Sequence, residues 1–183
     1  MYMFKFCLVI LILGASGCTK NIIIKAPSSN NLGESSGKNI LVIAPVKFAE
    51  TLEVRDAVRV ECQLLTKLSE FIKRAAHSQY ETIDLQGSIT KNTDILLIEI
   101  IDLPKYKKNI WIGQGGQWVG VKGDLIRQGQ KKVSFTALRT SMGGFMGAYK
   151  ATCSLLGRCT KTLGEDIARW LKNPLDNAQL GDL

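Results

Sequence analysis

The chain has 183 residues, a formal net charge of +8 and one histidine. This length suits a single domain with a substantial core. One histidine and the lack of a paired C-x-x-C motif argue against a metal site of the zinc type, and no basic motif with interleaved aromatic residues indicates nucleic-acid binding. The positive charge fits anionic lipid head groups, lipopolysaccharide or acidic partners, and it equally fits a simple role in solubility.

The start of the chain has the layout of a secretory signal. Lys5 supplies a positive charge, Phe6 to Leu13 form a short apolar run, and small residues follow up to Gly17. The apolar run is well short of the ~20 residues that a helix needs to span a bilayer. We therefore expect residues 1–17 to be a leader that is removed, and not a permanent membrane anchor.

A cysteine follows this leader directly. Ala15-Ser16-Gly17-Cys18 resembles the bacterial lipobox, in which small residues precede a cysteine that is lipidated, although Ala15 stands where the motif usually has leucine. We expect cleavage between Gly17 and Cys18, with diacylglycerol on the Cys18 thiol and an acyl chain on its amino group, because one chain alone anchors a protein only marginally. No other cofactor is expected. Thr19, in place of an aspartate, favours transport to the outer membrane, with the domain in the periplasm.

The chain from Cys18 onward divides into three predicted segments. Residues 18–38 are rich in serine, asparagine and glycine and predict a flexible linker between the lipid and the domain. Residues 39–174 are expected to form one periplasmic α+β domain. Residues 175–183 are expected to form a loose C-terminal tail.

Strands are predicted from apolar runs and alternation. Short apolar runs predict strands at 39–46 and 80–85, and a run of branched apolar residues predicts a central strand at 94–103. Alternation on both sides of Gln128-Gly129-Gln130 predicts a β-hairpin within 117–141.

Two helices, each with one apolar face, complete the domain. The first is predicted over about 56–76, and the second over about 145–171, ending before Pro174. The predicted order is β-α-β-β-β-β-α. Two amphipathic helices on one face of a mostly antiparallel sheet make a two-layer α+β sandwich.

Three cysteines remain once Cys18 carries lipid, which allows one disulfide in an oxidising compartment. Cys153 and Cys159 are close in sequence, but on one helix they lie ~9 Å apart along the axis and point in different directions. Cys62 and Cys153 lie on flanks of the two predicted helices, whereas Cys159 lies on the apolar face. We expect a Cys62–Cys153 disulfide and a buried Cys159 thiol. The alternative is three unpaired, buried cysteines.

Gly143, Gly147 and Ala151 recur at intervals of four residues and form a stripe of small side chains on the second predicted helix. Such a stripe allows close approach to another backbone, which indicates an interface. The competing interpretation is that glycine permits the turn from strand to helix and tight packing on the sheet. The N-terminus of this helix, with Arg139 nearby, is also suited to binding an anion.

Trp111 and Trp118 flank a glycine-rich segment, 112–117. Their side chains are candidates for contact with a sugar, a lipid or a partner, because tryptophan combines large apolar area with a polar group. Packing at the edge of the sheet is the alternative, and the one that we favour. His77 closes the first predicted helix, where positive charge suits the helix dipole. Nothing places a serine or cysteine beside it, so no catalytic residue is assigned.

Three stretches carry a resemblance to known proteins. "VRVECQLLTKLSEFI", "GQWVGVKGDLIRQGQ" and "SMGGFMGAYKATCSLLGRCTKTLGEDIARWLKNP" are similar to small uncharacterised outer-membrane lipoproteins of gram-negative bacteria, over most of the chain after the linker. The resemblance implies a location and a fold, and no activity. At the level of fold, the order of elements is similar to that of envelope assembly and transport-auxiliary lipoproteins, such as the partner lipoprotein of the lipopolysaccharide translocon; fold does not imply function.

These observations predict a non-enzymatic outer-membrane lipoprotein that acts as a binding or assembly module of an envelope complex, with an envelope protein or a second copy as partner. The alternative is a lipid or glycan carrier with an apolar groove near Trp111 and Trp118. A hydrolase acting on envelope polymers is disfavoured, because the chain has one histidine and no paired acidic motif.

Overall fold

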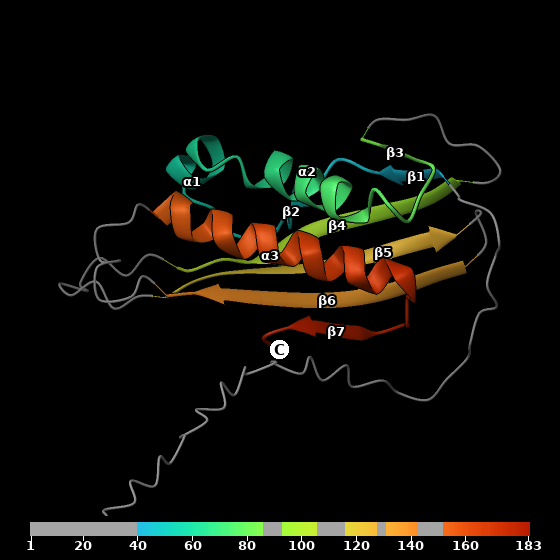
Figure 1. Cartoon of the computed structure of the whole chain (residues 1–183). Coiled ribbons are helices and arrows are strands. Elements are labelled where there is room, and N and C mark those ends of the chain that lie inside the picture. Colours follow the sequence, from blue (N-terminus) through green and yellow to red (C-terminus); the bar gives the residue numbers. More distant parts are fainter. Residues whose placement is uncertain (1–39, 86–92, 106–115, 128–130, 143–151) are drawn as a thin grey trace, which may run out of the picture.

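A computed structural model describes residues 40–85, 93–105, 116–127, 131–142 and 152–183 (Figure 1). Within these residues the strands are β1 (Ile40–Ile43), β2 (Lys47–Phe48), β3 (Thr82–Asp84), β4 (Thr93–Asp102), β5 (Gln117–Arg127), β6 (Lys131–Ser141) and β7 (Ala178–Gly181). The helices are α1 (Asp56–Glu61), α2 (Leu64–Ala76) and α3 (Thr152–Lys172). The predicted order of elements is present, with the short strands β2 and β7 added to it.

The strands form one mixed sheet in the order β3-β1-β4-β5-β6-β7, and β2 pairs with β4. The long strands β4, β5 and β6 are antiparallel, and β5 and β6 form the predicted hairpin, in register from Gln117 opposite Ser141 to Arg127 opposite Lys131. The short strands β1, β2, β3 and β7 pair in parallel with their neighbours. The α+β class and the mostly antiparallel sheet are therefore confirmed.

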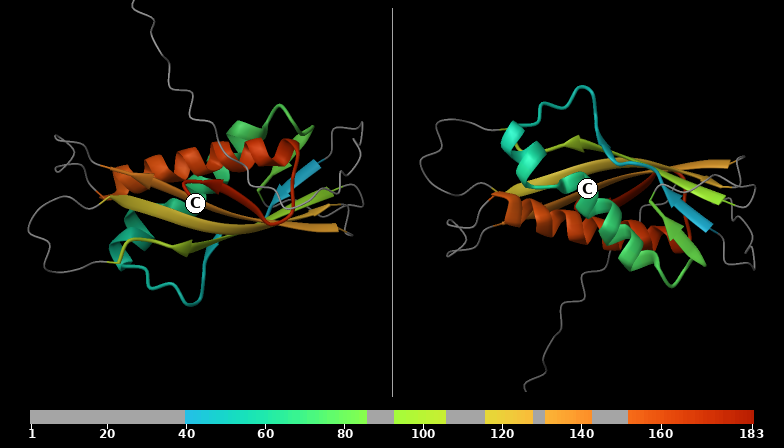
Figure 2. Two further views of the ribbon diagram at one scale, coloured as in Figure 1. Left: turned by 90° about the horizontal axis from the view of Figure 1, so that it is seen from below. Right: turned by 90° about the horizontal axis from the view of Figure 1, so that it is seen from above.

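Helices α2 and α3 lie side by side over one face of the sheet (Figures 1 and 2). Alternate residues of a strand point to opposite faces, so Leu96, Ile98 and Ile100 of β4 all point into the core, where they are at most 4% exposed. Opposite them, Ile72 of α2 and Leu163 of α3 are fully buried. In the described part of the chain, no helix combines the length and the apolar character that crossing a bilayer requires.

The two helices approach each other closely at Gly164 of α3. A Cβ atom there would lie 2.6 Å from the Cβ of Phe71 and 3.1 Å from the backbone nitrogen of Ile72, both in α2. Such separations are shorter than carbon and nitrogen atoms tolerate, so only glycine lets α3 pack this closely on α2.

The helix predicted over 56–76 is in fact two helices, which corrects the sequence prediction. α1 ends at Glu61 and α2 begins at Leu64, because Gln63 has left-handed backbone angles of φ 52° and ψ 38°. A right-handed helix cannot continue through a residue in that conformation. Apolar residues recur at helical spacing on both sides of Gln63, so periodicity alone does not reveal the break.

The C-terminal residues 175–183 do not form a loose tail, and this prediction was wrong. β7 extends the sheet in parallel with β6, with Ala178 opposite Phe135 and Leu180 opposite Ala137. Ala178 and Leu180 are 2% and 4% exposed, so they belong to the core. A run this short has too few alternating residues to be recognised as a strand.

Candidate functional site

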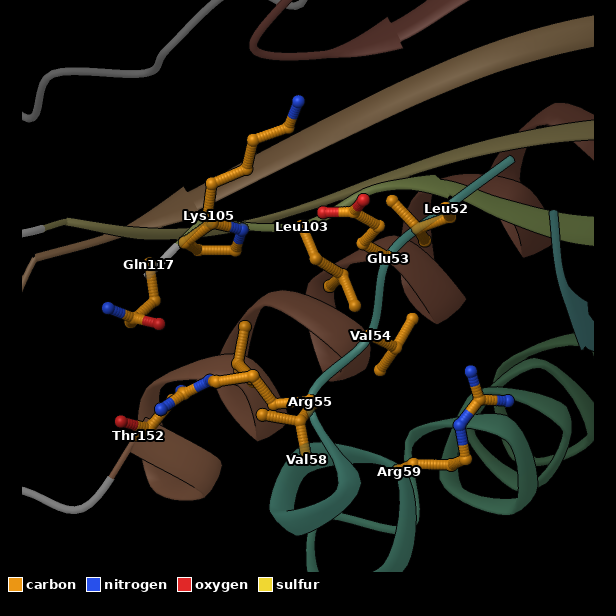
Figure 3. Close-up of a pocket in the computed structure, with 12 residues that line it drawn as sticks. Leu52, Glu53, Val54, Arg55, Val58, Arg59, Leu103, Lys105, Gln117 and Thr152 are labelled. Atoms are coloured by element: carbon orange, nitrogen blue, oxygen red, sulfur yellow. The ribbon is translucent and has the colours of Figure 1, made fainter. Parts of the chain in front are cut away.

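A cavity of about 600 Å³ lies at one end of the sheet, between α1, the first described turn of α3 and the ends of β4 and β5 that meet there (Figure 3). We call it the α1 cavity. Six of the residues that line it are apolar: Leu52, Val54, Val58, Leu103, Pro104 and Leu156. A volume in the range of ~300–1,000 Å³ is usual for small-molecule sites.

Local structure explains how each wall is placed. Val58 is the one buried residue of α1, so it fixes the side of that helix that faces inward. Leu103 and Pro104 directly follow β4, and proline ends the strand there because it has no N–H group to donate. Thr152 and Leu156 are four residues apart on α3 and therefore share one face of the helix.

A disulfide holds two of these walls together. Cys62, directly after α1, is bonded to Cys153 in the first turn of α3, with a Cα–Cα distance of 4.8 Å. That separation lies within the usual range for disulfides. The predicted Cys62–Cys153 pairing is therefore confirmed, and it ties α1 to α3 at the edge of the α1 cavity.

Charged side chains stand around the apolar walls. Glu53, Arg55, Arg59 and Lys105 line the α1 cavity, and all four are exposed. The guanidinium of Arg59 lies 5.2 Å from the centre of the Phe48 ring, a distance typical of a cation–π contact. Counted over the described lining residues, three cations stand against one carboxylate, so this part of the cavity surface carries more positive than negative charge.

The lining offers binding chemistry rather than metal ligation. Among the lining residues that the structure describes there is one carboxylate, Glu53, and neither histidine nor cysteine. Across the described residues, no group of three or more His, Cys, Asp or Glu side chains is placed to hold a metal ion. What the α1 cavity does supply is enclosed volume, apolar contact and positive charge.

Trp118, predicted as a possible contact residue, does not line this cavity. Its indole Nε1 donates a hydrogen bond to Asp102 Oδ2 at 2.9 Å. Successive residues of a strand point to opposite faces, so Trp118 lies on the same face of β5 as Lys122. The fully buried Val119 and Val121 lie on the other face. The structure thus places it on the sheet face away from the helices, where it joins the start of β5 to the end of β4.

Several predicted positions lie outside the described residues. They are the cleavage site Gly17 and Cys18, the stripe of Gly143, Gly147 and Ala151, and Trp111. Lipidation and an interface at the stripe therefore stay predictions.

Arg139 does not serve as a free anion-binding group. Its Nε and Nη2 donate hydrogen bonds to the Asp166 carboxylate at 2.6 and 3.0 Å, and its Nη1 donates to Asp182 Oδ1 at 2.8 Å. The hydrogen bond with Asp166 is the main reason that the pKa of Arg139 is raised. Its positive charge is already paired with the carboxylates of Asp166 and Asp182.

Cys159 is a buried thiol, as predicted from its place on the apolar face of α3. It donates a weak hydrogen bond to the Gln117 carbonyl, with Sγ 3.5 Å from the oxygen. Burial raises the pKa of this thiol to about 11, so it stays protonated and weakly reactive at neutral pH.

A second cluster of ionisable groups lies near the opposite end of β4. Asp94 is 1% exposed, and one of its carboxylate oxygens lies 3.6 Å from Arg127 Nε. The pKa of Tyr80 is raised to about 12, first by burial and second by the negative charge of Asp94, although Arg127 acts in the other direction. This cluster joins the start of β4 to the end of β5. The α1 cavity lies at the other end of β4, ~30 Å away along the strand.

The cavity residues themselves were not identified from the sequence. Leu52, Leu103 and Leu156 come from three separate segments. Nothing in the spacing of these residues shows that they meet. Two signals in the sequence pointed to this end of the molecule: the expected disulfide, and the expected groove near Trp118, whose neighbour Gln117 lines the cavity.

Comparison with known proteins shows the fold. No family model matches the chain, and no curated protein matches it. A crystal structure of an uncharacterised protein has 12% identity and a TM-score of 0.54, covering 73% of this chain and 92% of the other. The hypothetical protein CT253 from Chlamydia trachomatis has 12% identity and a TM-score of 0.47, covering 74% and 96%.

A lipoprotein, GNA1162 from Neisseria meningitidis, has 13% identity and a TM-score of 0.38, covering 72% of this chain and 99% of its own. At such low identities these likenesses show no shared activity. The first of the three, with its TM-score above 0.5, shows that this arrangement of sheet and helices occurs in another solved protein.

Proposed function

We propose that this chain is a lipid-anchored lipoprotein of the outer membrane whose periplasmic domain is a non-catalytic binding module of the cell envelope, and that the α1 cavity is its binding site. The anchor is supported by the lipobox-like Ala15-Ser16-Gly17-Cys18 and by the turn-rich residues 18–38 that follow it. An anchored domain on a flexible linker can reach a partner near the membrane.

The observation that carries the binding role is a cavity whose apolar wall includes core side chains of the domain. Val58, Leu103 and Leu156 belong to the buried residues of the domain and also face the cavity. Space beside core side chains costs stability, because dispersion contacts are missing there. A ligand that fills the space makes those dispersion contacts, and they favour its binding.

A lipid or glycan carrier is the second candidate function. The observation that favours it is the composition of the lining, in which six of the twelve described residues are apolar. A carrier would release its ligand to an acceptor, whereas a module of an envelope complex would hold a partner in place.

The test is site-specific photo-crosslinking in cells that produce the full chain. A photoreactive residue replaces Arg59 beside the α1 cavity, and in a matched strain it replaces Lys172, which is also exposed and lies at the other end of α3. The 21 residues of α3 span ~30 Å, so Lys172 lies far from the first turn of that helix, which lines the cavity. Mass spectrometry then identifies the adducts and reads the mass of the peptide that contains Cys18.

We expect adducts that depend on the Arg59 position and a lipid-bearing Cys18 peptide. A protein adduct supports the envelope-complex role, and a lipid adduct supports the carrier. Identical adducts from both positions would overturn the α1 cavity as the binding site. An unmodified Cys18 would overturn the lipid anchor.

A further inference from the structure

The apolar wall of the α1 cavity is continuous with the core. Val58, Leu103 and Leu156 are 6%, 5% and 1% exposed, and Leu52 and Val54 add half-buried side chains from the segment before α1. Figure 3 shows Leu52, Val54 and Leu103 together in the middle of the view, with Lys105 extending away from them. A hydrocarbon chain is the kind of ligand that such a wall favours, since it buries apolar area and leaves no hydrogen bond unmade.

Three cationic residues also line the cavity, and we call them the cationic rim (Arg55, Arg59 and Lys105); their side chains extend in different directions around the apolar wall (Figure 3). All three are exposed, and within the described part of the chain Glu53 is the one acidic residue that lines the same cavity. Neither Arg59 nor Lys105 forms an ion pair with a carboxylate among the described residues. Positive charge in excess at a cavity mouth attracts an anionic group and keeps it partly solvated.

We propose that the α1 cavity binds a single-chain amphiphile with an anionic head group. The hydrocarbon chain lies against the apolar wall, and the head group lies at the cationic rim. This proposal rests on the binding role given above and names the chemistry of the ligand for that same site. A sugar fits less well, because Gln117 and Thr152 are the only uncharged polar side chains among the described residues of the lining, and sugar hydroxyl groups set against an apolar wall would lack partners.

The experiment measures binding of two lysophospholipids that share one acyl chain and differ in head-group charge. The full chain carrying Cys18→Ser is titrated calorimetrically with palmitoyl-lysophosphatidylglycerol, which is anionic, and with palmitoyl-lysophosphatidylcholine, which is zwitterionic. Both are kept below their micelle-forming concentrations. We expect the anionic lipid to bind about fivefold more tightly at low ionic strength, and this advantage to shrink in high salt, because exposed charges are screened.

Two arginines of the chain offer a matched pair of variants. Arg59 lies 5.2 Å from the Phe48 ring, and Arg74, on α2, lies 5.1 Å from the Phe71 ring. Both are exposed, but only Arg59 lines the α1 cavity. Arg59→Gln should weaken binding of the anionic lipid about threefold and leave the zwitterionic lipid nearly unchanged. Arg74→Gln should affect neither.

Filling the cavity tests where the chain of the lipid lies. Val54→Trp, with Leu52→Trp as a second variant, should abolish binding of both lipids, and thermal unfolding shows whether each variant is folded. If the two lipids bind with equal affinity and the tryptophan variants lose this binding, the preference for an anionic head group is wrong, while the binding role of the cavity stands. Absence of binding by both lipids, or binding that both folded tryptophan variants retain, would overturn the amphiphile itself.

Discussion

Arg139 joins three separate parts of the chain through one side chain. It lies on β6, and its guanidinium binds Asp166 on α3 and Asp182, which directly follows β7. Arg169 approaches the same Asp166 carboxylate at 3.4 Å. Asp166 is 4% exposed, so its negative charge depends on these partners for compensation.

Replacing Asp166 should therefore destabilise the fold measurably. Asp166→Asn leaves the guanidinium of Arg139, 18% exposed, with Asp182 as its remaining carboxylate partner. We expect a loss of about 2–3 kcal/mol in the free energy of unfolding, measured by urea denaturation; removing one partner of a fully buried pair costs ~3–5 kcal/mol. The matched control is Asp124→Asn, which breaks the exposed 3.0 Å pair with Lys132 and should cost no more than ~0.5–1 kcal/mol. Equal losses in the two variants would contradict this account.

At the scale of elements, the most consequential link is the disulfide between α1 and α3. α1 has only six residues, and one of them, Val58, is buried. So short a helix is not stable alone in water. The bond from Cys62 to Cys153 holds it against the start of α3, and both elements line the α1 cavity.

The double variant Cys62→Ala/Cys153→Ala should be less stable by about 2–4 kcal/mol, because the bond closes a loop over a sequence separation of 91 residues and so restricts the unfolded chain. Urea denaturation under oxidising conditions measures the difference. A reductant should lower the stability of the natural chain by a similar amount and leave the double variant unchanged. If reductant made no difference to the natural chain, the bond would not be contributing to stability.

At the scale of the whole molecule, β7 covers the outer edge of the long strand β6. Its pairing covers Phe135 to Leu138 of β6. On either side of that stretch, aspartate side chains accept hydrogen bonds from the backbone of β6. Asp176 Oδ1 accepts one from the Ser134 amide at 2.8 Å, and Asp182 Oδ2 accepts one from the Thr140 amide at 2.9 Å. Occupied amides of this kind protect an edge strand from pairing with another chain.

The contribution of Asp182 should depend on pH. Burial by itself would raise the pKa of this carboxyl, but hydrogen bonds from the amide and hydroxyl of Thr140, together with Arg139, hold it below its ordinary value of 3.8. A carboxyl whose pKa is lower in the folded state stabilises the fold fully above the unfolded value, and this stabilisation is lost as pH falls through the folded value.

Asp182→Asn should therefore lower the free energy of unfolding at pH 7 by about 1–2 kcal/mol, since the variant loses charge-assisted hydrogen bonds. The difference between the natural chain and Asp182→Asn should shrink as pH falls below 3.8. Urea denaturation of both proteins at neutral and acidic pH measures this. A difference that stays constant over the whole range would contradict the proposed role of the carboxylate.

Much of the fold follows from local sequence pattern. Alternation predicted the β5–β6 hairpin, branched apolar residues predicted β4, and apolar faces predicted where the helices lie on the sheet. The Cys62–Cys153 pairing also followed from the sequence, because helix geometry excluded the pair nearest in sequence. Patterns of this kind act between residues a few positions apart, so they can be read along the chain. The leader and the lipid on Cys18 rest on the sequence alone and stay predictions.

Other features were decided only by tertiary structure. The break at Gln63 interrupts a pattern that reads as one helix, and β7 is a strand because β6 offers it an edge and the core accepts Ala178 and Leu180. The α1 cavity is likewise formed by side chains from three segments that meet only after folding. A cavity is space that packing leaves unfilled, and packing depends on the shapes of residues far apart in the chain. The sequence alone therefore determined the elements and the bond that ties two of them together, while the site between them came from how those elements pack.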